Sequence, residues 1–157
     1  MKKFIIASSL IAIVVGVILM IGGIWGICFT YKNVVAENIV TPQDSSIPGK
    51  PVRGPMTLMA QVDIIRKHTL DTTGGKTFAE MPRQIPKLDE LGAPVLDAEG
   101  NLVMTANTAR DIWMTATTLI TALNLGVLTY AFFSVVILFG LFSIWAGIAV
   151  YVLERAR

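Results

Sequence analysis

Histidine and cysteine are each present only once among the 157 residues, and charged residues make up only 15% of the chain. A disulfide needs two cysteines, and a cysteine zinc site or a multi-histidine metal centre needs several sulfur or nitrogen ligands. The chain alone therefore cannot build either. Because 54% of its residues are hydrophobic, its composition is typical of a membrane protein.

Clustered positive charge is also lacking. The formal net charge is +2, and residues 32–113 alternate acidic and basic side chains. A nucleic-acid-binding surface needs clustered Lys and Arg to displace counterions from phosphates. We therefore expect no nucleic-acid partner. Two long apolar runs also leave too little chain for a large catalytic domain.

The first apolar run extends from Phe4 to Tyr31 and contains no Asp, Glu, Lys, Arg or His. As a helix it would be about 40 Å long, more than the hydrocarbon core of about 30 Å requires. A cleaved secretory signal is the alternative, because two lysines precede the run and Val34-x-Ala36 resembles a cleavage site. The apolar core of such a signal is only about 7 to 15 residues, so the length favours a membrane span.

The second uncharged run extends from Ile112 to Leu153 and would form about 63 Å of helix, twice the membrane thickness. We expect the span to begin near Val127. A three-span alternative would need a turn at Asn124–Gly126 and would place the basic C-terminus outside, against the positive-inside rule. The two-span arrangement places both termini in the cytoplasm.

The residues before this second span have an amphipathic pattern. Thr108-x-x-Asp111 is a capping-box signature that would begin a helix. The helix could lie on the membrane surface or continue straight out of the span. Its expected apolar side consists of Ile112, Ala116, Leu119, Ile120 and Leu123.

Seven prolines divide the segment between the spans into short elements. We expect an extended, solvated strap at Thr41–Gly54 and a helix at about Thr57–Thr69 that ends at Gly74-Gly75. A helical turn is predicted at Thr77-x-x-Glu80 and a small β-hairpin at Pro94–Met104.

The expected fold class is thus a mainly α membrane protein with two transmembrane helices that flank a small, irregular extracytoplasmic segment. It has four parts: an N-terminal helix with a short cytoplasmic start (1–31), the outer segment (32–107), the amphipathic helix (108–126) and the C-terminal span with its cytoplasmic tail (127–157). The predicted location is the cytoplasmic membrane, with residues 32–126 largely extracytoplasmic.

Small residues form a stripe on each predicted span, which indicates close helix packing. The two helices of one molecule would pack together, and neighbouring chains could use the remaining surface. The candidate packing residues are Ala12, Gly16, Gly22, Gly23 and Gly26 in the first span and Gly140, Ser143 and Gly147 in the second.

No catalytic, cofactor-binding or metal-binding residues are predicted. His68 has Asp63 and Asp71 nearby in the sequence but no second nitrogen ligand. Gly74-Gly75-Lys76-Thr77 lacks the spacing of a phosphate-binding loop and is better explained as a helix stop followed by a cap. Neither span contains an ionisable acid or base, so the chain alone is not expected to be a pump or transporter.

The stretches Gly49–Pro55, Ala60–Met81 and Ala109–Asn124 are distinctive. They resemble an uncharacterised family of small bacterial two-span membrane proteins, many labelled aromatic ring-opening dioxygenase. The resemblance implies the order span, polar segment, span. A ring-opening dioxygenase needs an iron held by several nitrogen or carboxylate ligands, which His68 and scattered acids do not supply.

The leading hypothesis is a non-catalytic accessory subunit of a larger respiratory, photosynthetic or oxidative membrane complex. Its partners would be the lipid bilayer and other integral membrane subunits. The alternative is an independent, membrane-anchored binding or sensing module. The candidate partner contacts, which the family resemblance implies, are His68, Gly74, Gly75, Lys76, Glu80 and Trp113.

Overall fold

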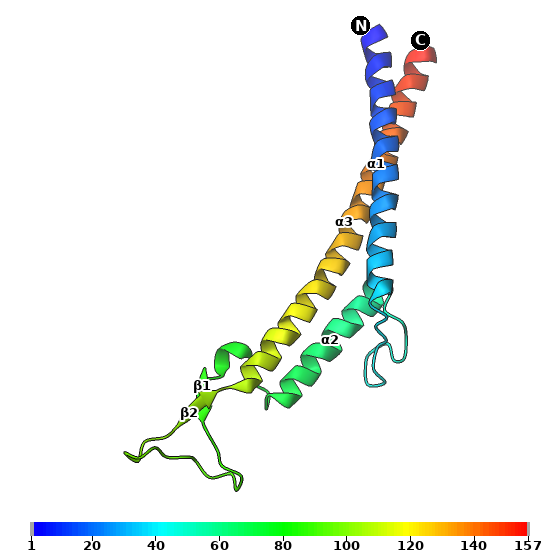
Figure 1. Ribbon diagram of the computed structural model, residues 1–157. Helices are drawn as coiled ribbons and strands as arrows, with labels where there is room; N and C mark the ends of the chain where they lie inside the picture. Colours follow the sequence, from blue (N-terminus) through cyan, green and yellow to red (C-terminus); the bar gives the residue numbers. More distant parts are fainter. Residues whose placement is uncertain (1, 157) are drawn as a thin grey trace.

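The computed structural model describes residues 2–156 and is mainly helical (Figure 1). Within this range, α1 and α3 are long and apolar enough to cross a membrane, and the two termini lie at the same end of the pair. The chain is therefore a membrane protein of mainly α structure. The elements are α1 (Lys2–Ala36), α2 (Pro55–Thr72), η1 (Phe78–Glu80), β1 (Gln84–Pro86), β2 (Met104–Ala106) and α3 (Thr108–Ala156).

Helix α3 is continuous over 49 residues, or about 74 Å. The predicted amphipathic helix and the second span are two parts of this one helix, because neither Asn124 nor Gly126 interrupts it. Figure 1 shows its N-terminal part extending past the end of α1, with α2 alongside. The amphipathic part thus continues out of the span as an arm.

The helix begins one residue earlier than the predicted capping box suggests. Oδ1 of Asn107 accepts a hydrogen bond from the Ala109 amide at 3.2 Å, so Asn107 is the N-cap and Thr108 is already helical. The Asn107 carboxamide also donates to the Pro82 carbonyl at 3.0 Å. The Asn107 side chain therefore caps the helix and also joins its start to the chain at Pro82.

Helices α1 and α3 pack through small residues at seven-residue intervals. On α1 the buried residues include Ser9, Gly16 and Gly23, and on α3 they include Gly140 and Gly147. A Cβ atom at Gly16 would lie 2.6 Å from the Gly140 carbonyl oxygen, and one at Gly147 would lie 2.8 Å from the Ser9 carbonyl oxygen. A seven-residue repeat keeps one stripe facing its partner along a left-handed pair, which explains this close approach.

Most of the predicted packing residues lie in this interface. The Gly23 and Gly26 positions face Ile137 and Phe133, and Ser143 Oγ donates to the Ala12 carbonyl at 2.8 Å. Gly22 does not lie in the interface, because a Cβ atom there would meet nothing within 4 Å. The Gly22–Gly26 pair spans four residues, and only Gly26 coincides with the stripe, so Gly22 faces outward.

A second core forms where α2 packs on α3 near the end of α1. It comprises Val52, Leu58, Val62, Ile120, Leu123 and Tyr130, with Leu58 only 1% exposed. Tyr130 also donates a hydrogen bond from its hydroxyl to the Arg53 carbonyl at 2.8 Å. This bond fixes the start of α2 against α3.

The buried face of the arm differs from the predicted one. Ala116, Ile120 and Leu123 are buried as expected, but Ile112 and Leu119 are 42% and 50% exposed. Trp113, which was assigned to a partner contact, takes the buried position instead, because it packs one helical turn before Ala116. The buried stripe is therefore rotated by about one residue toward α2.

The strap, residues 41–54, is ordered rather than extended. Thr41 is 2% exposed, and its backbone N–H donates to the Lys50 carbonyl at 3.0 Å while its hydroxyl accepts from the Lys50 N–H at 3.0 Å. The Thr41 hydroxyl also donates to the Ile47 carbonyl. One buried hydroxyl thus closes the loop, which the low apolar content of the sequence did not predict.

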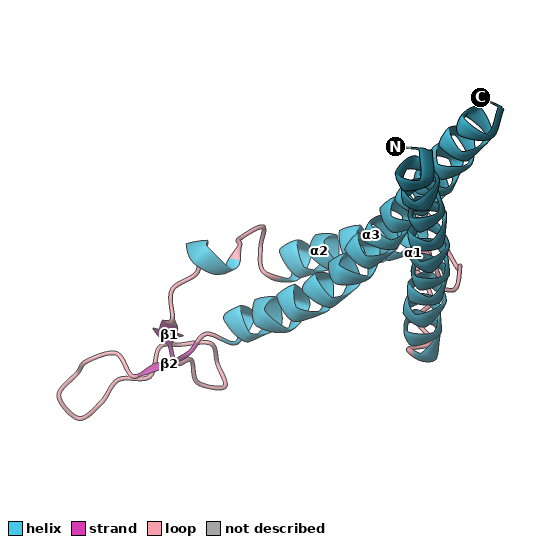
Figure 2. Cartoon of the chain, turned by 90° about the horizontal axis from the view of Figure 1, so that it is seen from above, coloured by secondary structure: helices cyan, strands magenta, loops and turns pink. Residues whose placement is uncertain are grey.

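The tip, residues 87–103, consists of two tight turns, and the pair of strands β1 and β2 joins it to the arm (Figure 2). Leu96 and Leu102 form a bridge within the predicted hairpin, but Met104 pairs with Pro86 rather than with Pro94. Residues 87, 95 and 103 are joined in a ring of three backbone hydrogen bonds of 2.8–2.9 Å. Because Pro86 pairs with Met104 and Leu88 pairs with Pro94, the chain around the Asp89 turn pairs with both ends of the predicted hairpin.

Candidate functional site: a groove where three helices meet

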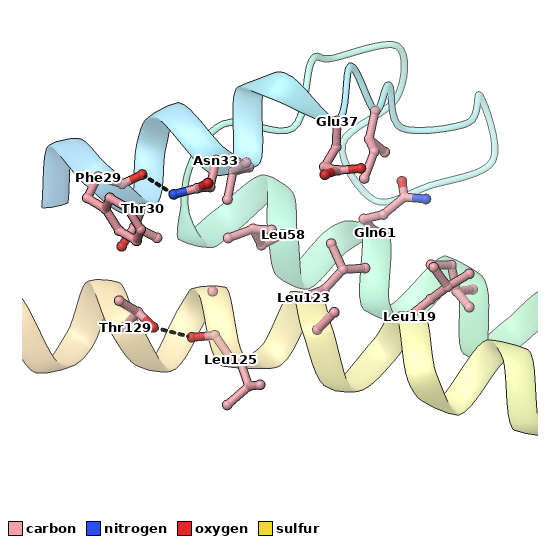
Figure 3. A pocket seen from close by; sticks show the side chains of 15 residues that line it. Phe29, Thr30, Asn33, Glu37, Leu58, Gln61, Leu119, Leu123, Leu125 and Thr129 are labelled. Carbon is pink, nitrogen blue, oxygen red and sulfur yellow. Dashed lines mark hydrogen bonds between the residues drawn. The ribbon is translucent and has the colours of Figure 1, made fainter. Parts of the chain in front are cut away.

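A groove of about 690 Å³ lies between the C-terminal end of α1, the first half of α2 and the middle of α3. Figure 3 shows its side chains arriving from all three helices. Its volume lies within the roughly 300–1,000 Å³ that is typical of small-molecule sites. The lining residues are Phe29, Thr30, Asn33, Val34, Glu37, Ile39, Leu58, Gln61, Ile65, Leu119, Ala122, Leu123, Leu125, Gly126 and Thr129.

The groove exists because α1 stops while α3 continues. Asn38 adopts a left-handed backbone conformation with φ of 51° and its amide bonds the Val35 carbonyl at 3.1 Å, which ends the helix. The chain then forms the strap and returns as α2, whose start is held to α3 by Tyr130. The three helices diverge from this junction, and the space between them is the groove.

The groove walls are mostly aliphatic, but one end is polar. The Gln61 side-chain oxygen is buried and has no hydrogen-bond partner among the described residues. Glu37 and Asn33 contribute the other strongly polar side chains, and the Asn33 amide donates to the Phe29 carbonyl at 2.8 Å. No Lys or Arg lines the groove. A ligand here would meet an apolar channel lined on one side by the polar residues Asn33, Glu37 and Gln61.

A second hollow of about 590 Å³ lies further along the arm, between α2 and α3. It shares Ile65 and Leu119 with the groove and also includes Ile112. The two exposed members of the predicted apolar face, Ile112 and Leu119, are therefore the residues that line these hollows.

His68 lies at the edge of the second hollow and bonds the strap. Its Nε2 is 2.8 Å from Asp44 Oδ2, and Lys67 Nζ is 3.3 Å from the same oxygen. The hydrogen bond to His68, followed by that to Lys67, lowers the pKa of Asp44 below its ordinary value of 3.8. The lone histidine therefore holds a loop in place.

Trp113 and the Gly74–Lys76 turn form a second tertiary clamp. The Trp113 indole is buried and donates to Thr73 Oγ1 at 3.0 Å and to the Lys76 carbonyl at 2.7 Å. Gly74 and Gly75 have φ of 62° and 76°, values that glycine adopts without strain, and they end α2 as expected. The indole bonds explain why a tryptophan suits this position.

Glu80 caps the helical turn that the sequence predicts at residues 77–80. Its carboxylate accepts from the backbone amide and the hydroxyl of Thr77, each at 2.7 Å, and these bonds lower the pKa of Glu80. Arg110 lies over the Phe78 ring at 3.8 Å and donates to the Phe78 carbonyl at 3.1 Å. The six candidate contact residues thus lie on or beside the outer half of the arm, and all but Gly74 have hydrogen-bond partners within the chain. Their role in binding a partner stays a prediction.

The tip contains an eight-residue repeat that the sequence analysis missed. Asp89 Oδ1 accepts from two backbone amides at 2.9 Å, and Asp97 Oδ1 accepts from two at 3.0 and 2.7 Å. Gly92 and Gly100 follow at the same positions with φ of 81° and 83°. The signal was present as Leu-Asp-x-x-Gly at 88–92 and again at 96–100.

The repeat holds apolar side chains in water. Leu91 is 94% exposed, and Leu88, Leu96 and Leu102 are each about half exposed. Hydrogen bonds from Asn101 lower the pKa of Asp97, so this turn is fixed at neutral pH. Four exposed leucines thus lie within one short segment whose turns are held by hydrogen bonds.

The described residues contain no group of three or more His, Cys, Asp or Glu side chains that could hold a metal ion. The groove and the tip are therefore the two features whose geometry is suited to binding. No protein-family model, curated protein or solved structure matches the chain.

Proposed function

We propose that the chain is a non-catalytic accessory subunit of a larger integral membrane assembly, anchored by α1 and α3 and reaching a partner protein through the tip. Both termini are cytoplasmic in this proposal, because Lys2, Lys3 and Arg155 flank the spans at one end. The arm, the strap and the tip then lie outside the cytoplasm.

The observation that carries the proposal is the set of exposed leucines on the fixed turns of the tip. Four leucines and the partly exposed Met104 lie at the far end of the arm from the termini. The Asp89 and Asp97 turns hold their backbone before any partner binds, which lowers the entropy lost on binding. Apolar residues presented in this way favour a protein partner.

The packing of the outer segment supports a subunit over an independent module. The core beneath α2 takes Ile120, Leu123 and Tyr130 from α3. A fragment of residues 32–111 would lose these three side chains and with them most of its apolar contacts. The outer segment therefore depends on the membrane helices for its structure.

The proposal is tested by site-specific photo-cross-linking in native membranes. A photoreactive amino acid at Leu91 is expected to capture a membrane protein, whereas the same amino acid at Met114, which is 60% exposed on the arm, is the matched control. Leu91→Ser should abolish comigration with the larger complex in a mild detergent. Migration of the wild-type chain alone, with no protein captured at Leu91, would contradict the proposal.

A further inference from the structure

We propose that the groove between α1, α2 and α3 binds one acyl chain of an amine-bearing glycerophospholipid from the adjacent leaflet, on the side of the membrane that carries the arm. This site is separate from the tip and goes beyond the role of an accessory subunit.

The position of the groove at the membrane boundary is the first argument. Phe29 lies in the last turn of the first apolar run, and Leu125 and Thr129 lie on either side of Val127, where the second span is expected to begin. Leu119 and Ile65 lie further out along the arm. An apolar surface thus continues from the lipid-facing helices into the groove. A chain can enter from the hydrocarbon without crossing water.

The length of the groove matches the occupant. Its lining on α3 runs from residue 119 to residue 129, which is about 15 Å of helix. One leaflet contributes about half of a hydrocarbon core of roughly 30 Å, so one acyl chain is about as long as the groove. Burying its methylene groups against aliphatic walls supplies the affinity.

The polar side chains select the headgroup. The Gln61 oxygen is enclosed by protein atoms and lacks a donor, and a buried carbonyl group without a hydrogen bond is costly. A turn of the Gln61 side chain toward a donor in the groove would therefore be favourable. Glu37 supplies the only carboxylate among the lining residues. The lining contains no Lys or Arg side chain that could attract an additional anionic group. An ammonium headgroup offers both a hydrogen-bond donor and a positive charge, so it suits this end better than an uncharged glycerol headgroup.

The experiment uses the full chain in nanodiscs that contain phosphatidylethanolamine with a diazirine on one acyl chain. After irradiation, peptide mapping measures lipid attached to residues 119–123, which precede the second span. Wild type is expected to be labelled there. Ala122→Phe should reduce this labelling about tenfold, because the ring displaces several methylene groups from the groove.

Thr121→Phe is the matched control, since Thr121 is exposed and does not line the groove. It should leave the labelling of residues 119–123 unchanged. Labelling of Phe132, Leu138, Phe139 and Phe142, which are exposed on α3, reports the amount of folded, inserted protein in every sample and should be equal in both variants.

Gln61→Leu tests the headgroup. In competition with unlabelled lipid, the wild type should prefer phosphatidylethanolamine to phosphatidylglycerol, and Gln61→Leu should lose much of that preference while still taking the chain. Equal labelling of Ala122→Phe and wild type would overturn the site. Capture of a protein instead of lipid by a photoreactive residue at position 122 would overturn it in favour of a helix partner, and an unchanged preference in Gln61→Leu would overturn the headgroup assignment.

Discussion

Replacement of Gly16 by alanine provides a direct test of the α1–α3 interface. The new Cβ atom would lie 2.6 Å from the Gly140 carbonyl oxygen and 2.9 Å from the Ile144 backbone nitrogen. Because a carbon approaches a carbonyl oxygen to about 3.3 Å at the closest favourable contacts, the helices would have to separate locally by roughly 0.7 Å. Overpacking of this kind typically costs about 1–3 kcal/mol.

Gly22→Ala is the control for the same chemical change. Alanine is favoured over glycine in a helix by about 1 kcal/mol, and this term is common to both variants. At Gly22 the added Cβ meets nothing within 4 Å, so only the favourable term remains. We expect Gly16→Ala to be less stable than Gly22→Ala by about 1–3 kcal/mol.

The measurement is unfolding of the full chain in mixed micelles, followed by energy transfer between dyes at the two termini. These termini lie at the same end of the helix pair, so separation of α1 and α3 lowers the energy transfer. A difference between the two variants below about 0.5 kcal/mol would refute the proposed contact. Gly140→Ala combined with Gly16→Ala should cost less than the sum of the single changes, because the first separation makes room for the second methyl group.

Three further changes test other contacts. Ser143→Ala removes the hydrogen bond to the backbone of α1 and should cost about 0.6 kcal/mol in the same assay. Trp113→Phe removes the indole donor from the Lys76 carbonyl and should increase amide exchange in residues 73–81 while the helix pair is unchanged, with a cost of about 1–3 kcal/mol. The hydrogen bond from His68 lowers the pKa of Asp44, so the bond that holds the strap persists above the ordinary value of 3.8 and is lost as acidification protonates Asp44 below it. Pepsin should cut the strap of Asp44→Asn faster than that of the wild type while Asp44 is ionised. The ratio of the two cutting rates, which cancels the pH dependence of pepsin itself, should approach one as Asp44 is protonated.

The sequence predicted the features that depend on local composition. Two uncharged runs longer than a membrane is thick indicate two long apolar helices, which the structure confirms. The end of α2 at Gly74-Gly75 and the turn capped by Glu80 also follow from neighbouring residues. Such signals are reliable because each is decided within one or two helical turns.

The interface between α1 and α3 was predicted only in part. Four-residue spacing of small residues identified Gly22, which faces outward, and passed over Ser9, which is buried. The packing follows a seven-residue repeat that continues on both helices, and a sequence pattern on one helix does not show which stripe its partner will contact. The register between the two helices decides it.

The sequence by itself determined that this chain has two helices long and apolar enough to cross a membrane and a small, mostly polar segment between them. Only the tertiary structure decided that α3 continues as an arm, that Trp113 rather than Ile112 is buried against α2, and that Gln61 faces a groove. The physical reason is that hydrophobicity and helix ends depend on neighbouring residues, whereas a groove depends on where one helix stops and another continues. Residues distant in sequence, such as Arg53 and Tyr130, fix that arrangement.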